Sequence, residues 1–266
     1  MLAIKNVTFS YTPDVPVLHD ISLTFDSRTT AIIGQNGTGK TTLVKLIKGL
    51  LTCQEGSIEI EGKEIKDLKV SEIAKDIGLV FQNPNDQIFK NKVRDEIEFG
   101  PLNIGKSKEE TTKLANDAMA LLGIAELADK NPYDLGLSER KLISIASILA
   151  MDTKVIILDE PTIAQDYKGK QLIKNVIKKL QAEGKLVIAI LHDMDFVAET
   201  FDRAVVMKKG RILLDDRVKI VFSQAETLEE AYLEAPSIVK LSQELGEEDI
   251  YLTVEEFLKS KGKTAY

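Results

Sequence analysis

Nine residues, 34–42 (GQNGTGKTT), constrain the fold of this chain more than any other segment. The apolar run 31–33 precedes them and the largely apolar run 43–47 follows. The sequence therefore predicts a buried strand that turns through glycines into a helix. The spacing matches G-x-x-x-x-G-K-[ST], in which backbone N–H groups surround the phosphates of a nucleotide. A glycine-rich turn that meets this pattern by chance is the alternative, and the strand–loop–helix context argues against it.

Within this loop, two side chains have specific expected roles. Lys40 is expected to reach the β- and γ-phosphates, and the Thr41 hydroxyl is expected to bind Mg²⁺. The N-terminus of the following helix adds a partial positive charge. The predicted nucleotide-binding residues of the loop are Gly34, Gln35, Asn36, Gly37, Thr38, Gly39, Lys40, Thr41 and Thr42.

Size and charge narrow the possible functions. The 266 residues suffice for one large domain or a domain and a half. A net charge of −7 argues against a broad contact with nucleic acid or anionic lipid. The longest uncharged apolar run, 142–151, is about half of the length that spans a bilayer, and the N-terminus lacks the pattern of a signal peptide. We therefore expect a cytoplasmic protein that reaches a membrane only through a protein partner.

Hydrophobic periodicity predicts an α/β fold interrupted by helices. Segments 4–11 and 17–25 alternate as strands, whereas 77–81, 155–158 and 186–191 are continuous apolar runs typical of strands buried on both faces. Segment 85–150 has helical periodicity and predicts a helical insert between two halves of a sheet. Segment 167–183 predicts an amphipathic helix.

The tail from about residue 221 predicts short acidic helices broken at Pro236. Its apolar positions are Leu228, Tyr232, Ile238 and Leu241. These apolar side chains need something to cover them.

Polar residues end three of the predicted buried strands, where α/β sheets place ligand-facing groups. Gln82 follows one strand, and Asp159 follows the next with a carboxylate suited to the Mg²⁺ that Thr41 contacts. Glu160 is a candidate to polarise an attacking water, or alternatively a helix-capping acid. His192 is a candidate contact for the γ-phosphate, or alternatively a packing residue.

Taken together, these motifs resemble the nucleotide-binding subunit of an ATP-binding cassette (ABC) transporter over nearly the whole chain. The resemblance implies a P-loop NTPase (RecA-like) core, an antiparallel β subdomain, a helical signature subdomain and a small C-terminal helical dimerisation region. The implied ATPase domain covers 1–220 with its helical insert at about 85–150, and the implied dimerisation region covers 221–266. ATP and Mg²⁺ are the implied cofactors.

The same resemblance implies a role for each polar residue at a strand end. Asp159 resembles the Walker B aspartate, and Gln82 resembles the Q-loop glutamine, which joins Thr41 and Asp159 as a metal ligand and acts in catalysis. Glu160 is implied as the catalytic base and His192 as the switch histidine.

At the end of the first strand, Tyr11 is implied as the aromatic residue that stacks on adenine. Simple packing at the strand end is the alternative role for this ring.

Two further motifs resemble a subgroup, the ATPases of energy-coupling factor transporters, which power uptake of vitamins or of cobalt and nickel ions. They are 82–89 (QNPNDQIF) and 99–103 (FGPLN), and segments 192–195 and 252–256 fit the same subgroup. The resemblance implies a paralogous ATPase partner, a transmembrane scaffold and a separate substrate-binding membrane subunit, with this chain at the cytoplasmic face of the membrane. Segment 83–89 is expected to form a groove for a scaffold helix, with Ile88 and Phe89 as its apolar contacts.

The chain departs from the family pattern in its signature, normally Leu-Ser-Gly-Gly-Gln. Segment 135–139 has LGLSE, so Gly136 takes the serine position and Leu137 takes that of the first glycine. In the family two subunits enclose ATP head to tail, and each signature completes the partner's site. The missing hydroxyl is therefore expected to weaken one of two sites in an asymmetric heterodimer. Gln165, where the family usually has leucine, has no explanation from the sequence.

Two other functions stay open. A soluble cassette protein of DNA repair or translation predicts fused cassettes, zinc-binding cysteines or a basic face, and this sequence has a single cysteine and a net negative charge. A structural subunit that binds ATP without hydrolysing it fits the altered signature. Glu160 and His192 argue against that second alternative.

Overall fold

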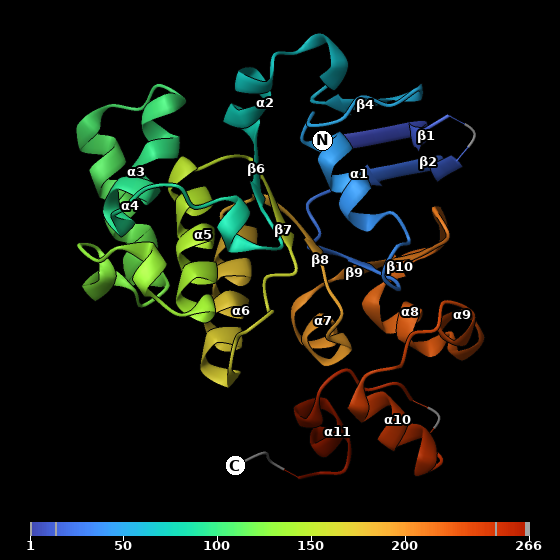
Figure 1. Cartoon of the computed structure of the whole chain (residues 1–266). Coiled ribbons are helices and arrows are strands. Elements are labelled where there is room, and N and C mark those ends of the chain that lie inside the picture. Colours follow the sequence, from blue (N-terminus) through green and yellow to red (C-terminus); the bar gives the residue numbers. More distant parts are fainter. Residues whose placement is uncertain (1, 14, 248, 264–266) are drawn as a thin grey trace.

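In the computed structural model, which describes residues 2–13, 15–247 and 249–263, two β-sheets organise the chain. The described residues form a six-stranded sheet in the order β10-β9-β3-β8-β7-β6 and a four-stranded sheet in the order β2-β1-β4-β5 (Figure 1). Helices cover the larger sheet on both faces, which is the arrangement that its continuous apolar strands require.

The larger sheet is parallel except for its edge strand β10, which pairs antiparallel with β9. Its strands are β3 (Thr30–Ile33), β6 (Ile77–Val80), β7 (Val155–Asp159), β8 (Leu186–Ile190), β9 (Arg203–Lys208) and β10 (Arg211–Arg217). Every residue of β3, β6 and β7 is buried. The register pairs Asp159 of β7 with Ile190 of β8, so the carboxyl ends of these strands lie side by side.

The smaller sheet is antiparallel and packs over α1 (Lys40–Ile47). Its strands are β1 (Leu2–Thr12), β2 (Val15–Phe25), β4 (Glu55–Ile60) and β5 (Lys63–Glu64). Their inward side chains join those of α1, α2 (Val70–Asp76) and one face of the larger sheet in a single hydrophobic core.

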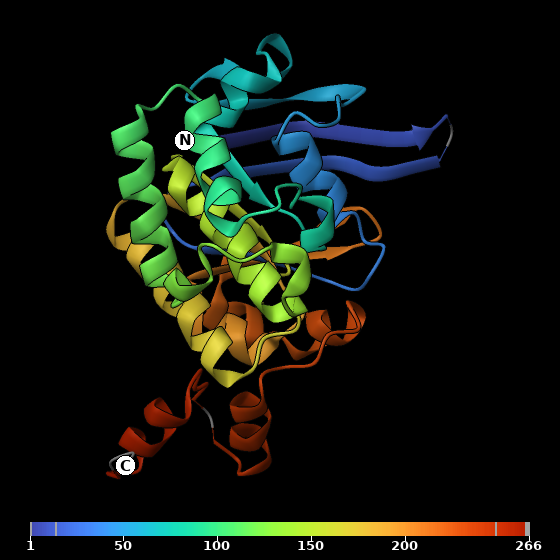
Figure 2. The ribbon, with the colours of Figure 1, turned by 60° about the vertical axis from the view of Figure 1, so that its left-hand side comes forward.

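The opposite face of the larger sheet packs against helices in a second core. The helical insert supplies α3 (Val93–Asn103), α4 (Lys108–Leu121) and α5 (Leu137–Met151), which α6 (Tyr167–Ala182) and α7 (Met194–Thr200) join. Figure 2 shows the green helices of the insert on one side of the molecule and the blue strands of the smaller sheet on the other. The predicted helical character of 85–150 is thus confirmed for this segment.

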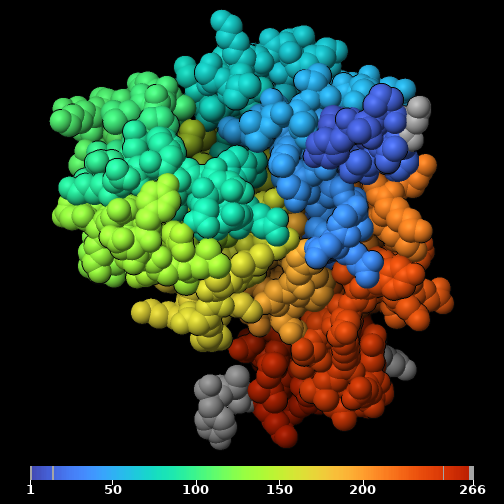
Figure 3. All heavy atoms as spheres, viewed as in Figure 1, coloured from blue at the N-terminus to red at the C-terminus, as the bar shows by residue number. Residues whose placement is uncertain are grey.

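The C-terminal segment continues as α8 (Val218–Ser223), α9 (Ala225–Glu230), α10 (Ser237–Glu244) and α11 (Val254–Ser260). Of these helices, α10 and α11 form a lobe below the rest of the chain, coloured orange-red to dark red in Figure 3. Leu228 and Ile238 are buried in the second core of their own chain, whereas Tyr232 and Leu241 are 70% and 45% exposed. The chain itself therefore covers two of the four apolar positions. Across the described residues, no helix is both long and apolar enough to cross a membrane.

Candidate functional site

The loop between β3 and α1 needs its glycines for steric reasons. Gly39, the residue before α1, has φ +95°, and a Cβ there would lie 2.6 Å from Leu18 Cδ2. A Cβ on Gly34 would lie 2.3 Å from the carbonyl oxygen of Met207. Both positions therefore exclude larger residues, and the loop curls tightly enough to bring its N–H groups toward a ligand.

Lys40 lies inside this curl. Its Nζ donates to the carbonyl oxygens of Gly34 at 2.7 Å and Gln35 at 2.8 Å. Burial lowers the pKa of Lys40, while Glu160 and Asp159 act in the opposite direction. These two hydrogen bonds use two of the three ammonium donors, which leaves the third for a phosphate oxygen.

Two adjoining cavities bring the predicted phosphate and metal residues together. The first, about 310 Å³, is lined by Val17, Asn36, Gly37, Gly39, Lys40, Thr41, Thr42, Gln82 and Glu160. The second, about 410 Å³, shares Thr41 and Gln82 and adds Asp159. The carboxyl ends of β6 and β7 thus meet the N-terminus of α1, as strand ends and helix starts do at the ligand sites of open α/β sheets.

The surroundings of the Asp159 carboxylate show whether the second cavity fits a metal ion. Its side chain is buried, and Oδ1 has no hydrogen-bond partner among the described residues. Burial raises the pKa of Asp159 to about 6, and the Thr41 hydroxyl counteracts this. A buried carboxylate oxygen without a partner is costly unless a cation pairs with it. Carboxylate, hydroxyl and amide oxygens are ligands that Mg²⁺ accepts, so Thr41, Gln82 and Asp159 fit that ion.

Glu160 and His192 contact each other beside the first cavity. His192 Nε2 lies 3.2 Å from Glu160 Oε1, and the two side chains are 37% and 12% exposed. Glu160 has φ +48°, a left-handed conformation that costs a non-glycine residue about 1–3 kcal/mol. Such strain is typical of functional sites.

Tyr11 lies at the rim of the site, at the end of β1. Its hydroxyl is 3.2 Å from Thr42 Oγ1, and its ring packs edge-on against Phe9 with centroids 4.9 Å apart. The side chain is nevertheless 57% exposed. The ring is therefore packed on Phe9 and still has an exposed surface close to Thr42 of the phosphate loop.

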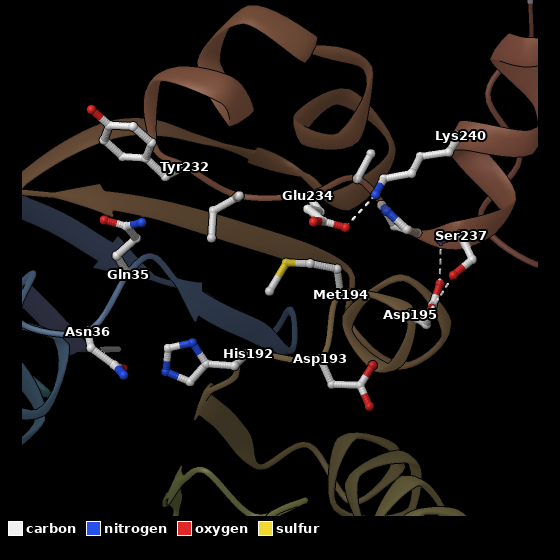
Figure 4. Close-up of a pocket in the computed structure, with 13 residues that line it drawn as sticks. Gln35, Asn36, His192, Asp193, Met194, Asp195, Tyr232, Glu234, Ser237 and Lys240 are labelled. Carbon is white, nitrogen blue, oxygen red and sulfur yellow. Dashed lines mark hydrogen bonds and ion pairs between the residues drawn. The ribbon is translucent and has the colours of Figure 1, made fainter.

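Beyond His192 lies a larger cavity of about 740 Å³ (Figure 4). Gln35 and Asn36 of the loop and residues 192–195 line one side, and residues 232–237 and Lys240 line the other. Asp195 accepts hydrogen bonds from the N–H and the hydroxyl of Ser237, at 2.7 and 2.8 Å. The C-terminal segment is thereby anchored three residues after His192.

The altered signature begins α5. Gly136 is the exposed N-cap residue, and its N–H donates to Glu139 Oε2 at 2.8 Å. The Ser138 hydroxyl donates to Gln165 Oε1 at 3.2 Å, and Gln165 Nε2 donates to the Ser138 carbonyl at 3.1 Å. The two departures from the family pattern therefore contact each other. Sequence reasoning missed this pair because the residues are 27 positions apart.

The structure of segment 83–89 differs from the expectation that Ile88 and Phe89 both lie at the surface. Ile88 is only 3% exposed and belongs to the second core, so its prediction as a surface contact is wrong. Phe89 is 52% exposed and stacks edge-on against Phe99, with centroids 4.7 Å apart. Lys90 Nζ lies 4.6 Å from the Phe99 centroid. Adjacent residues often point in opposite directions, and an apolar pair does not tell which one faces the core.

The fold and the loop define a P-loop ATPase of the ABC class. The sequence profile described as ABC transporter matches residues 18–163, and the chain belongs to this family. One relative is the energy-coupling factor transporter ATP-binding protein EcfA2 of Caldanaerobacter subterraneus subsp. tengcongensis. It is 40% identical over an alignment of 269 residues, gaps included, that covers 96% of this chain and 94% of that relative.

Solved structures agree with this assignment. That of cbiO1 from Clostridium perfringens, part of the ABC transporter complex cbiONQ, has a TM-score of 0.76 at 32% identity and covers 91% of this chain and 98% of its own. The ATP-binding cassette MJ0796, in a post-hydrolysis state bound to ADP and Pi, has a TM-score of 0.75 at 26% identity, with coverages of 82% and 99%. The predicted fold class is confirmed.

Proposed function

We propose that this chain is the ATP-binding and ATP-hydrolysing subunit of an energy-coupling factor importer for a vitamin or for cobalt or nickel ions. The observation that carries the proposal is the Glu160–His192 contact beside the cavity that Lys40 and Thr41 line. Relatives named as energy-coupling factor ATPases, at 37–40% identity over nearly the whole chain, support the choice of subgroup.

In the proposed mechanism, loop N–H groups and Lys40 hold the β- and γ-phosphates, and the exposed face of Tyr11 stacks on adenine. Thr41, Gln82 and Asp159 would hold Mg²⁺, which would supply positive charge to neutralise the charge that develops on the phosphates. Glu160 orients and polarises the attacking water and accepts its proton. His192 fixes the Glu160 carboxylate and lies within reach of the γ-phosphate, so positioning and charge stabilisation supply the catalysis.

The partners follow from the same proposal. A paralogous ATPase, and not a second copy of this chain, completes the nucleotide site head to tail. Gly136 offers the partner's phosphate no hydroxyl, so a homodimer would lack this donor in both sites. The Ser138 hydroxyl does not replace it, since it donates to Gln165 of its own chain. A hydrogen bond to a charged group contributes about 1.5–3 kcal/mol, enough to make the two sites hydrolyse ATP at different rates.

Segment 83–89 with Phe99 forms the proposed contact with the transmembrane scaffold. Phe89 and Phe99 form an exposed aromatic patch there, with the ammonium of Lys90 over both rings, and Gln82 directly precedes segment 83–89. A shift of Gln82 on hydrolysis is thus passed to the scaffold through contiguous residues. A substrate-binding membrane subunit completes the importer, and this chain lies at the cytoplasmic face of the membrane through its protein partners.

Co-purification and reconstitution test the proposal. The tagged chain, expressed from its native locus, is expected to isolate a second cassette ATPase and two membrane proteins, identified by mass spectrometry. The complex in lipid vesicles is expected to accumulate a vitamin or a metal ion only with Mg-ATP. Isolation of the chain with DNA-repair or ribosomal proteins, and with no membrane protein, would contradict it.

A further inference from the structure

Lys141, in the second turn of α5, is buried to 1% exposure and is not part of the cavity walls described above. Its Nζ donates to the carbonyl oxygens of Phe81, Gln82 and Asp159, each at 2.9 Å. All three donors of the ammonium are therefore satisfied by backbone. Burying an ammonium is costly, and this set of three acceptors offsets the cost.

The three carbonyls lie where the ladder between β6 and β7 stops. The last paired residues of the two strands are Val80 and Leu158. Beyond that pair Lys141 bridges the two chain segments, through carbonyls on Phe81, Gln82 and Asp159. The bridged residues include Gln82 and Asp159, two of the three proposed metal ligands.

The same lysine belongs to the helix that carries the altered signature. Lys141 follows Glu139 by two positions, and α5 begins at Leu137. One side chain thus joins the proposed metal ligands of this chain's own site to the helix that, in the proposed dimer, faces the partner's nucleotide.

We propose that Lys141 is a positioning residue of the ATPase site. Its ammonium fixes the backbone of Gln82 and Asp159 at the spacing that lets their side chains share one Mg²⁺ ion, and it couples that spacing to the orientation of α5. The inference rests on the proposed function for the identity of the metal-nucleotide. It adds a residue that contacts neither metal nor nucleotide.

The chain offers a matched control at the other end of β6. Lys48 Nζ donates to the carbonyl oxygen of Ile77, the first residue of that strand. Burial lowers the pKa of Lys48 and of Lys141 alike, to about 8 in each case. Both lysines donate hydrogen bonds to backbone carbonyls at an end of β6. Only Lys141 does so at the end where Gln82 and Asp159 lie.

The test is a Mg²⁺ titration of equilibrium ATP binding to the full chain, followed with a fluorescent ATP analogue. Lys141→Met is expected to raise the half-saturating Mg²⁺ concentration by at least about 10-fold, as loss of a residue that orients metal ligands does. Its nucleotide affinity in EDTA is expected to stay within about 3-fold of wild type. Lys48→Met is expected to leave both quantities within about 2-fold, and Lys141→Arg, which keeps charge and donors, to stay nearer wild type than Lys141→Met.

An unchanged Mg²⁺ requirement in Lys141→Met, or an equal rise in Lys48→Met, would overturn the inference. If Lys141→Met does not fold, Lys141→Gln takes its place, because its amide retains two donors, and a rise in the Mg²⁺ requirement is again expected. The wild-type titration separates the positioning role of Lys141 from the proposed ATPase function. A wild-type chain that binds no nucleotide, with or without Mg²⁺, contradicts the proposed function itself.

Discussion

The Ser138–Gln165 pair joins the start of the signature helix to the residue just before Asp166, the N-cap of α6. Each of its two hydrogen bonds is expected to contribute about 0.5–1.5 kcal/mol. Ser138→Ala and Gln165→Leu are expected to destabilise the chain singly, and the double variant by less than the sum, because both remove one shared interaction. The free energy of unfolding in denaturant measures this.

A distant pair serves as the control for that cycle. Gln181, near the other end of α6, donates to Asp202. Ser138→Ala combined with Gln181→Leu is expected to be additive within about 0.5 kcal/mol. Additivity of the Ser138 and Gln165 variants would show that the hydrogen bond from the Ser138 hydroxyl to Gln165 contributes nothing to stability.

The lowered pKa of Lys48 predicts a pH dependence of stability. The folded chain releases the proton of Lys48 near pH 8, whereas the unfolded chain keeps it to about pH 10.5. The unfolded state then binds more protons in this window, so Lys48 makes stability rise with pH, by up to about 1.4 kcal/mol per pH unit. Lys48→Met is expected to lack this contribution when unfolding is compared at pH 8 and pH 10.

Lys66→Met is the control for the pH comparison. Lys66 is exposed, and its ion pair with Glu64 raises its pKa, so both states keep that proton in the same window. The stability of Lys66→Met is expected to change with pH as wild type does. A Lys48→Met variant with the wild-type pH dependence would contradict the prediction.

Individual residues of the site were largely predictable, and their pairings were not. The loop at 34–42 and the polar ends of strands follow from local patterns, because the spacing itself requires the chemistry. Lys141 gave no local signal: a lysine in a helix is ordinarily solvated, and only the meeting of α5 with two strand ends explains its burial. The Gln165 deviation acquired an explanation only from its contact with Ser138.

Among the elements, α3 and segment 83–89 present Phe89 and Phe99 to solvent as the proposed scaffold contact. Phe89→Asp is expected to abolish co-purification of the membrane partners while the isolated chain stays folded and binds ATP. Val70→Asp is the matched control, since Val70 has the same 52% exposure on α2, and it is expected to leave assembly intact. Normal assembly of Phe89→Asp would rule this surface out.

Ile88, the buried neighbour of Phe89, is expected to respond differently to a charge. Ile88→Asp places a charge in the second core, so the chain is expected to misfold instead of losing only its partner. This contrast matters because a charge at Ile88 would otherwise be mistaken for evidence about the interface.

Strands were predictable from the sequence where apolar runs are continuous, as at β6, β7 and β8, and one end of each differs from the prediction by a single residue. The strand order β10-β9-β3-β8-β7-β6 was not predictable, because crossover connections decide it and leave no local pattern.

In the tail, periodicity marked Leu228 and Tyr232 alike as apolar. Only tertiary packing separates the buried Leu228 from the exposed Tyr232.

At the scale of the whole molecule, the proposal makes this chain one half of an asymmetric ATPase. It supplies Lys40, Thr41, Asp159, Glu160 and His192 to one nucleotide site and an impaired signature to the other. Hydrolysis is therefore expected to depend mainly on the site built from this chain's loop. A homodimer of this chain would have the deficit in both sites, so it is expected to be much less active than the heterodimer.

Substitution of Glu160 by glutamine tests the central claim most directly, because the amide keeps the shape and loses the base. In the assembled complex, Glu160→Gln is expected to retain ATP binding and lose hydrolysis by about 10²-fold or more. Glu183→Gln, on the exposed end of α6, is the control and is expected to hydrolyse ATP normally. The equivalent substitution in the partner ATPase is expected to cost far less activity. Near wild-type hydrolysis by Glu160→Gln would contradict the assignment of Glu160, and equal losses in the two subunits would contradict the asymmetry.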